Sequence, residues 1–131
     1  MIVSAHVATG AAAGVLAGSR GRALAIGAAL HALADRVPHR DIYDRPFEIG
    51  SGAALVALLA LVRGPLDPAV VGALASCAPD VEHIVRLPRP GGRKLYPSHR
   101  VHGWHRSGGL PAPLQLLAAG AVVGLLLQRK P

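Results

Sequence analysis

The sequence predicts an all-α fold, a small helical membrane protein of about five apolar helices, and three observations support this class. The 131 residues are 51% apolar and only 16% charged, a composition that excludes a disordered chain. Alanine, glycine and leucine form unbroken stretches, while aromatic residues make up only 3%. The residue types that favour strands are therefore sparse. A chain of this length forms one domain, so we expect residues 1–131 to fold as a single helical unit.

Five apolar runs are the predicted helices, and prolines fall at their edges, where helices start or stop. The runs cover about residues 2–19, 22–35, 51–63, 68–78 and 110–128. Only the first and the fifth reach the roughly 20 residues that cross a hydrocarbon layer of about 30 Å. The shorter runs indicate partial insertion or a thinned bilayer.

Small residues recur at helical spacing in three of these runs. The stripes are Gly10, Gly14 and Gly18 one turn after His6; Gly27, His31 and Asp35; and Gly72, Ser76 and Asp80. In lipid, such stripes let helix backbones approach closely. An alanine- and glycine-rich sequence also produces single stripes by chance, but chance explains less easily why all three include or adjoin a histidine or an aspartate.

Alternating helix directions would gather the polar residues at one end. If a short turn at residues 20–22 makes the first two helices antiparallel, all seven histidines lie at one end, together with six of the seven acidic residues. Asp67 is the exception. The basic, histidine-rich loop of residues 84–109 falls at the same end. We therefore expect a His/Asp cluster there.

Three clusters supply candidate metal ligands. His31 and Asp35 are four residues apart, hence on one helix face, and Pro38 bends the chain so that His39 can turn back toward them. The predicted ligands are His6, His31, Asp35, His39, Asp80, His83, His99, His102 and His105. Imidazole with carboxylate suits zinc, and iron or manganese if more oxygens join. A single His–Asp pair is more often a buried hydrogen-bonded contact, and the last cluster also fits a basic headgroup-binding loop.

The ligands outnumber the needs of one ion, so one or two ions are expected. Bound metal would activate water for hydrolysis, with Asp41 or a solvated Glu82 as general base. Arg100, Arg106 and Lys94 are candidates to neutralise an anionic substrate.

The order of these motifs resembles a bacterial family of small membrane-bound, inner-membrane-associated metal-dependent hydrolases, over nearly the whole chain. The matching residues are His6, the run His31-x3-Asp35-x2-Pro38-His39-x-Asp41, Pro79-Asp80-x2-His83, and His99-Arg100. A fainter similarity links the chain to zinc-dependent phospholipase C. The resemblance implies a helical membrane protein with a metal site and phosphoester or lipid hydrolysis. The last motif departs from the family pattern, since Trp104 replaces a threonine, which leaves His102 and His105 as alternative ligands.

The charge pattern indicates which partners the protein binds and where in the cell it lies. The net charge is +7, and its short basic segments between apolar runs favour membrane lipid or a phosphate-bearing substrate over specific nucleic-acid binding. Nine of the 14 lysines and arginines fall at the histidine end, so the positive-inside rule favours a site facing the cytoplasm from the inner membrane.

No basic residue precedes Arg20, which argues against a cleaved signal peptide. Cys77 is alone, which excludes an intrachain disulfide.

The leading hypothesis is therefore a membrane-embedded metal-dependent hydrolase of phosphoester or lipid-headgroup bonds. A second hypothesis is a metal-binding protein without catalysis, whose ions are saturated by protein ligands. A third is a structural membrane module whose histidines make hydrogen bonds only.

Overall fold

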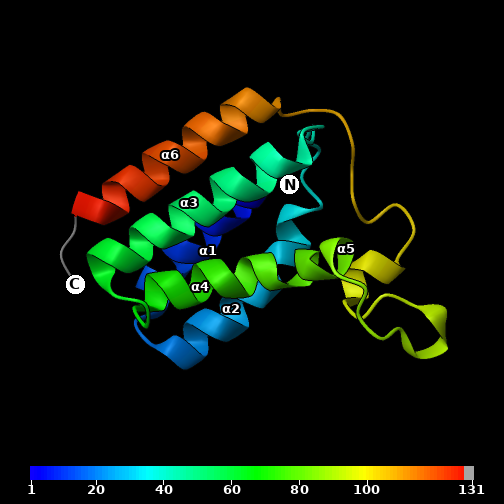
Figure 1. Ribbon diagram of the computed structural model, residues 1–131, viewed down its shortest axis with the longest axis horizontal. Coiled ribbons are helices and arrows are strands. Elements are labelled where there is room, and N and C mark those ends of the chain that lie inside the picture. Colours follow the sequence, from blue (N-terminus) through cyan, green and yellow to red (C-terminus); the bar gives the residue numbers. More distant parts are fainter. Residues whose placement is uncertain (129–131) are drawn as a thin grey trace.

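The computed structural model describes residues 1–128 and has the predicted all-α architecture (Figure 1). Its five longer helices are α1 (Val3–Ala17), α2 (Arg20–Ala34), α3 (Arg45–Arg63), α4 (Pro68–Cys77) and α6 (Ala112–Gln128). The short elements are η1 (Ala78–Asp80), α5 (Val81–Ile84), η2 (Pro90–Gly92) and η3 (Pro97–Arg100).

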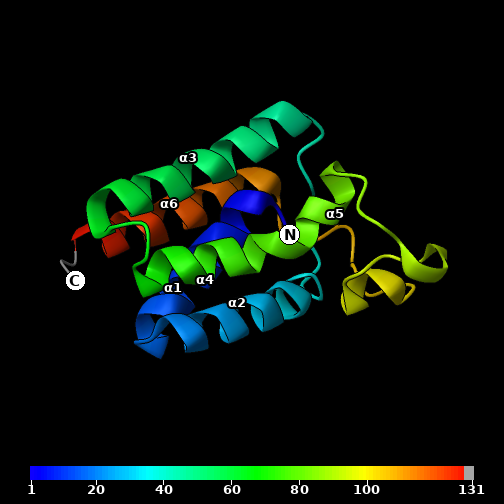
Figure 2. The same ribbon diagram turned by 60° about the horizontal axis from the view of Figure 1, so that its bottom comes forward.

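Helix α1 lies at the centre of the bundle and contacts α2, α3, α4 and α6. Figures 1 and 2 show α3 and α6 on one side of α1, whereas α2 and α4 lie on the other side. The segment from α5 to the start of α6 extends from one end of the bundle in both views. This is the end at which the sequence predicts the His/Asp cluster.

Two helix boundaries differ from those predicted, and capping explains both. The turn between α1 and α2 is formed by Gly18, in the left-handed conformation with φ 66°, and Ser19, whose side chain accepts a hydrogen bond from the Arg22 amide. Helix α3 begins at Arg45, six residues before the predicted start, because the Asp44 side chain accepts from the Phe47 amide and so caps the helix. The apolar run alone marked only the later part of α3.

The helix lengths correct the expectation about membrane spans. Helices α1 and α6 have 15 and 17 described residues, fewer than the roughly 20 that span a bilayer. Among the described residues, only α3, with 19, passes a length and hydropathy test for a span, and a single such helix is a weak indication.

The stripes of small residues are helix contacts, as predicted. A Cβ atom added to Gly10 of α1 would lie 2.3 Å from the carbonyl oxygen of Gly72 in α4, and one added to Gly27 of α2 would lie 2.5 Å from the same oxygen. Gly14 is equally close to α4, with 2.0 Å to the Pro68 carbonyl oxygen. Three backbones therefore meet at Gly72, which brings the polar ends of α1, α2 and α4 together. Gly18 makes no such contact and ends α1 instead.

The segment after α5 is attached to α2 and to the residues that follow α2 by backbone and side-chain hydrogen bonds. The Arg106 amide donates to the Asp35 carbonyl at 3.2 Å, and the His39 amide donates to the Arg106 carbonyl at 3.2 Å. The Trp104 indole donates to the Ala32 carbonyl at 2.8 Å, and the Tyr96 hydroxyl donates to the Ala28 carbonyl. These bonds hold the loop histidines over the ends of the helices.

Candidate metal centre

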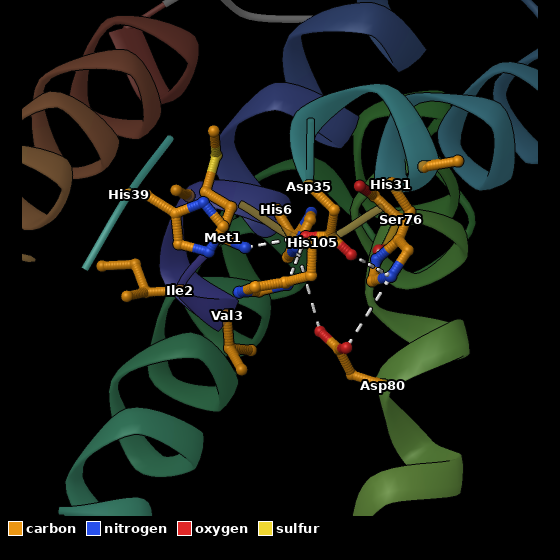
Figure 3. A network of polar contacts seen from close by, with 12 residues as sticks. Met1, Ile2, Val3, His6, His31, Asp35, His39, Ser76, Asp80 and His105 are labelled. Atoms are coloured by element: carbon orange, nitrogen blue, oxygen red, sulfur yellow. Dashed lines mark hydrogen bonds and ion pairs between the residues drawn. The ribbon is translucent and has the colours of Figure 1, made fainter. Parts of the chain in front are cut away.

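Histidines and aspartates from four parts of the chain meet where α1, α2 and α4 converge. His6 comes from α1, His31 from the last turn of α2, Asp35 from the residue that caps α2, and Asp80 from η1 directly after α4. Figure 3 shows Asp80 facing the rings of His6 and His31, with Asp35 above them. His6, His31 and Asp35 are buried. The predicted cluster is therefore present at the predicted end.

The protonation of two histidine rings follows from their partners. The Nδ1 atom of His31 lies 2.8 Å from the carbonyl oxygen of Ser76, which only accepts hydrogen bonds, so Nδ1 carries the proton. The Nδ1 atom of His99 donates in the same way to the carboxylate of Glu82. In their neutral forms, both rings therefore turn an unprotonated Nε2 atom toward the cluster.

These two Nε2 atoms are 3.1 Å apart. Two lone pairs at this distance repel each other unless a proton or a metal cation lies between them. Two histidine nitrogens on one zinc ion, each about 2.0–2.1 Å from it, are about 2.8–3.4 Å apart at octahedral to tetrahedral angles. The observed separation therefore fits a shared cation. Donation of Nδ1 to a carbonyl or carboxylate is also the usual arrangement for metal-binding histidines.

Two carboxylates complete this arrangement. The Nε2 atom of His31 lies 3.2 Å from Oδ2 of Asp35 and 3.7 Å from Oδ1 of Asp80. Burial favours a neutral Asp35, but the neighbouring histidines and the α-ammonium of Met1, 2.7 Å from Oδ1, outweigh it and hold the pKa of Asp35 well below its usual range. Burial raises the pKa of Asp80 to about 6, and the negative charge of Asp35 adds to this effect. A cation between the two carboxylates would favour ionisation of both.

His6 has no conventional partner for its ring. Neither ring nitrogen is hydrogen-bonded within residues 1–128, although both are buried. Its Nε2 atom lies 3.2 Å from Oδ1 of Asp35 and 3.9 Å from Oδ2 of Asp80. The ring stacks on that of His31, with centroids 4.3 Å apart. A buried polar atom without a partner is costly, and a bound cation would remove that cost.

A second group lies beside the first and includes His39, Asp41 and His105. The Nδ1 atom of His39 donates to the Val37 carbonyl at 2.7 Å, and its Nε2 atom lies 3.1 Å from Oδ1 of Asp41. His105 lies 3.5 Å from Oδ2 of Asp41 through Nε2, and 3.9 Å from Oδ1 of Asp35 through Nδ1. Asp35, His39 and His105 each offer a ligand atom within 4.8 Å of the others.

The remaining predicted ligands lie farther out. His83 is exposed, groups with Asp80 and His99, and accepts a hydrogen bond from the Lys94 ammonium at 3.2 Å. His102 is exposed and belongs to none of the ligand groups formed by the described residues. Of the two alternatives in the last motif, the structure thus brings His105, not His102, into the cluster.

Two residues proposed for catalysis have other surroundings than expected. Glu82 was expected to be solvated, which is wrong: it is 4% exposed, and its two oxygens accept from His99 Nδ1 and from the Leu95 amide. These bonds outweigh burial and lower the pKa of Glu82, so it is an ionised carboxylate that orients His99. Arg106 is exposed and is not among the residues that line the cavity over the cluster, and its backbone ties the loop to the end of α2.

A cavity of about 660 Å³ opens over the cluster. Asp35, Asp80 and His99 lie at its polar wall, and the basic residues Lys94 and Arg100 also line it. The Arg100 guanidinium is held by the backbone carbonyls of Lys94 and Leu95.

Sequence reasoning missed two residues of this site. Arg45 lines the cavity from the first turn of α3, and the Asp44-Arg45-Pro46 sequence, a helix cap followed by proline, was the signal for it. Ser76 contributes to the site through its backbone carbonyl, which orients His31, and the identity of a side chain does not reveal such a contact.

Searches with family models, among curated proteins and among solved structures found no match to the chain. The resemblance to membrane-bound metal-dependent hydrolases therefore stays a prediction. The site rests on its geometry.

Proposed function

We propose that the protein is a membrane-embedded, metal-dependent hydrolase of phosphoester or lipid-headgroup bonds. The observation that carries this proposal is the pair of Nε2 atoms of His31 and His99, 3.1 Å apart, at the edge of a cavity that also presents positive charge. The donor set of imidazoles and carboxylates suits zinc, with iron and manganese as alternatives.

A divalent cation held by His31, His99, Asp35 and Asp80 would supply Lewis acidity toward a phosphoryl oxygen and lower the pKa of a neighbouring water. Asp41 is the candidate general base, since it lines the cavity, is 53% exposed at its side chain and contacts two site histidines. Its partial exposure leaves it accessible to water, whereas both oxygens of Glu82 are engaged.

Three cations on the cavity wall support an anionic substrate. Lys94 and Arg100 come from the loop after α5, and Arg45 comes from the first turn of α3. Arginine and lysine together bind phosphate well, because guanidinium donates two parallel hydrogen bonds and ammonium adds a compact charge.

The surface of the bundle supports a membrane location. The buried apolar residues are mostly alanine, whereas leucines such as Leu16 and Leu61 are 88% and 84% exposed. A soluble protein rarely places its large apolar residues outside and its small ones inside, but helices in lipid pack through small residues.

A smaller apolar cavity supports a lipid-like substrate. It has a volume of about 290 Å³ and is lined by residues including Ala32, Tyr96 and Pro97. Ser98, Val101 and Trp104 line both cavities, so a phosphate in the larger cavity and an apolar group in the smaller one would be neighbours.

The test is hydrolysis by detergent-purified protein of bis(p-nitrophenyl) phosphate and of a short-chain phospholipid, with zinc or manganese added. We expect chelation and the double substitution H31A/D35A to abolish turnover. D67A, which removes a helix cap at the opposite end, controls for lost stability. Equal turnover in H31A/D35A and wild type would contradict the proposal.

A further inference from the structure

We infer that the site holds two cations, with Asp35 as the ligand they share. The inference deepens the proposed function, since it concerns the same metal centre. The position of the Asp35 carboxylate supports it. Its Oδ2 atom faces Nε2 of His31 at 3.2 Å and Nε2 of His99 at 3.9 Å. Its Oδ1 atom faces Nε2 of His6 at 3.2 Å and Nδ1 of His105 at 3.9 Å. The two oxygens of one carboxylate thus face different sets of nitrogens.

The side of Asp35 that faces His105 has a further unused ligand atom, on His39. The ring of His39 is fully buried, and its Nδ1 atom carries the proton because it donates to the Val37 carbonyl. The Nε2 atom therefore has a free lone pair, and within residues 1–128 it has no hydrogen-bond partner. The ring of His105 lies against that of His39, edge to face, with centroids 4.4 Å apart.

Positive charge already stands at this side of Asp35. The ammonium of Met1 lies 2.7 Å from Oδ1, and Figure 3 shows Met1 between His39 and the carboxylate. Asp41, 3.1 Å from Nε2 of His39, adds a further carboxylate. The surroundings of Oδ1 therefore already hold one positive charge, apart from the His31–His99 pair, and a metal cation bound there would displace the Met1 ammonium.

One ion cannot use all of these ligands. A zinc ion takes four ligands, and an octahedral divalent cation such as manganese takes six. The described groups around Asp35 offer more, namely His6, His31, Asp35, His39, Asp80, His99 and His105. A carboxylate with one oxygen on each ion suits the roughly 3.5–4 Å separation of the two metals in many phosphoester-cleaving sites. We therefore assign His31, His99 and Asp80 to one cation, and His39 and His105 to the other. His6, which faces Oδ1 of Asp35 and Oδ2 of Asp80, adjoins both.

The experiment counts bound zinc by elemental mass spectrometry after equilibration with zinc and removal of the excess. We expect two equivalents in the wild type, one in H39Q/H105Q and one in H99Q. Glutamine at position 39 retains a donor for the Val37 carbonyl, so the fold should be kept. D35N should lose both ions, or bind them at least 10-fold more weakly. H102Q, outside both ligand sets, should keep two.

The outcomes separate this inference from the proposed function. Two equivalents in the wild type together with one in H39Q/H105Q support the inference, even if no phosphoester is hydrolysed, and in that case only the proposed function fails. One equivalent in the wild type, or two in H39Q/H105Q, overturns the shared-ligand arrangement and leaves the hydrolase open to its own test. An absence of bound zinc, manganese and iron from folded wild type, after equilibration with each metal in turn, overturns both.

Discussion

Replacing Glu82 with glutamine tests how a buried carboxylate fixes the tautomer of His99. Glu82 accepts from His99 Nδ1 through one oxygen and from the Leu95 amide through the other. Glutamine has nearly the same shape but only one acceptor oxygen. Its NH2 group must therefore face one of two donors.

Both orientations of the new side chain harm the site. If the NH2 group faces His99, the ring can accept from it only by moving its proton to Nε2, which removes the lone pair needed for a metal. If the NH2 group faces Leu95, a buried amide loses its acceptor, and the loop that carries His99 loosens. Loss of such a partner of a metal-binding histidine weakens metal affinity by about 10–100-fold, or about 1.4–2.7 kcal/mol.

The assay is competition for zinc between the protein and a chromophoric chelator, with wild type, E82Q and E48Q compared. Glu48 lines the same cavity but belongs to none of the described ligand groups, so E48Q should change the affinity less than 3-fold. Thermal unfolding with EDTA separates lost affinity from lost stability. Equal zinc affinity in E82Q and wild type would refute the role of Glu82 as a positioning residue.

Three further predictions concern stability. G10A adds a methyl group 2.3 Å from the Gly72 carbonyl oxygen, and such overpacking should destabilise the fold by about 1–3 kcal/mol. Thermal unfolding in detergent measures this effect, and an unchanged unfolding midpoint would refute the close helix contact. D67A removes the acceptor for the Ala69 amide and for Arg63, so stability should fall by about 0.5–2 kcal/mol with zinc affinity unchanged. Zinc at 100 times its dissociation constant should raise the unfolding free energy by about 2.7 kcal/mol for each bound ion, and H31A/D35A should lose this increment. An equal increment in the double variant would place zinc elsewhere.

The sequence alone predicts the helices and the end at which the polar residues gather. Apolar runs, prolines and the Gly10 and Gly72 stripes each act locally, so they are readable from spacing. The grouping of His6, His31 and Asp80 follows from antiparallel helices that touch at these glycines. Helix caps such as Asp44 mark boundaries that the apolar runs do not.

The finer arrangement of the site depends on contacts across the fold. The orientation of His99 is determined by Glu82, 17 residues earlier in the chain, and that of His31 by a backbone carbonyl 45 residues later. The choice between His102 and His105 depends on how the loop crosses the end of α2. Such pairings have no local pattern in the sequence.

Anomalous diffraction at the zinc edge from crystals of the zinc-loaded protein tests the central claim most directly. We expect a peak about 2.0–2.1 Å from Nε2 of both His31 and His99, with Nδ1 of His31 still bonded to the Ser76 carbonyl and Nδ1 of His99 still bonded to Glu82. Ordered His31 and His99 rings without a zinc peak between their Nε2 atoms would contradict it, since the 3.1 Å separation would then be bridged by a proton.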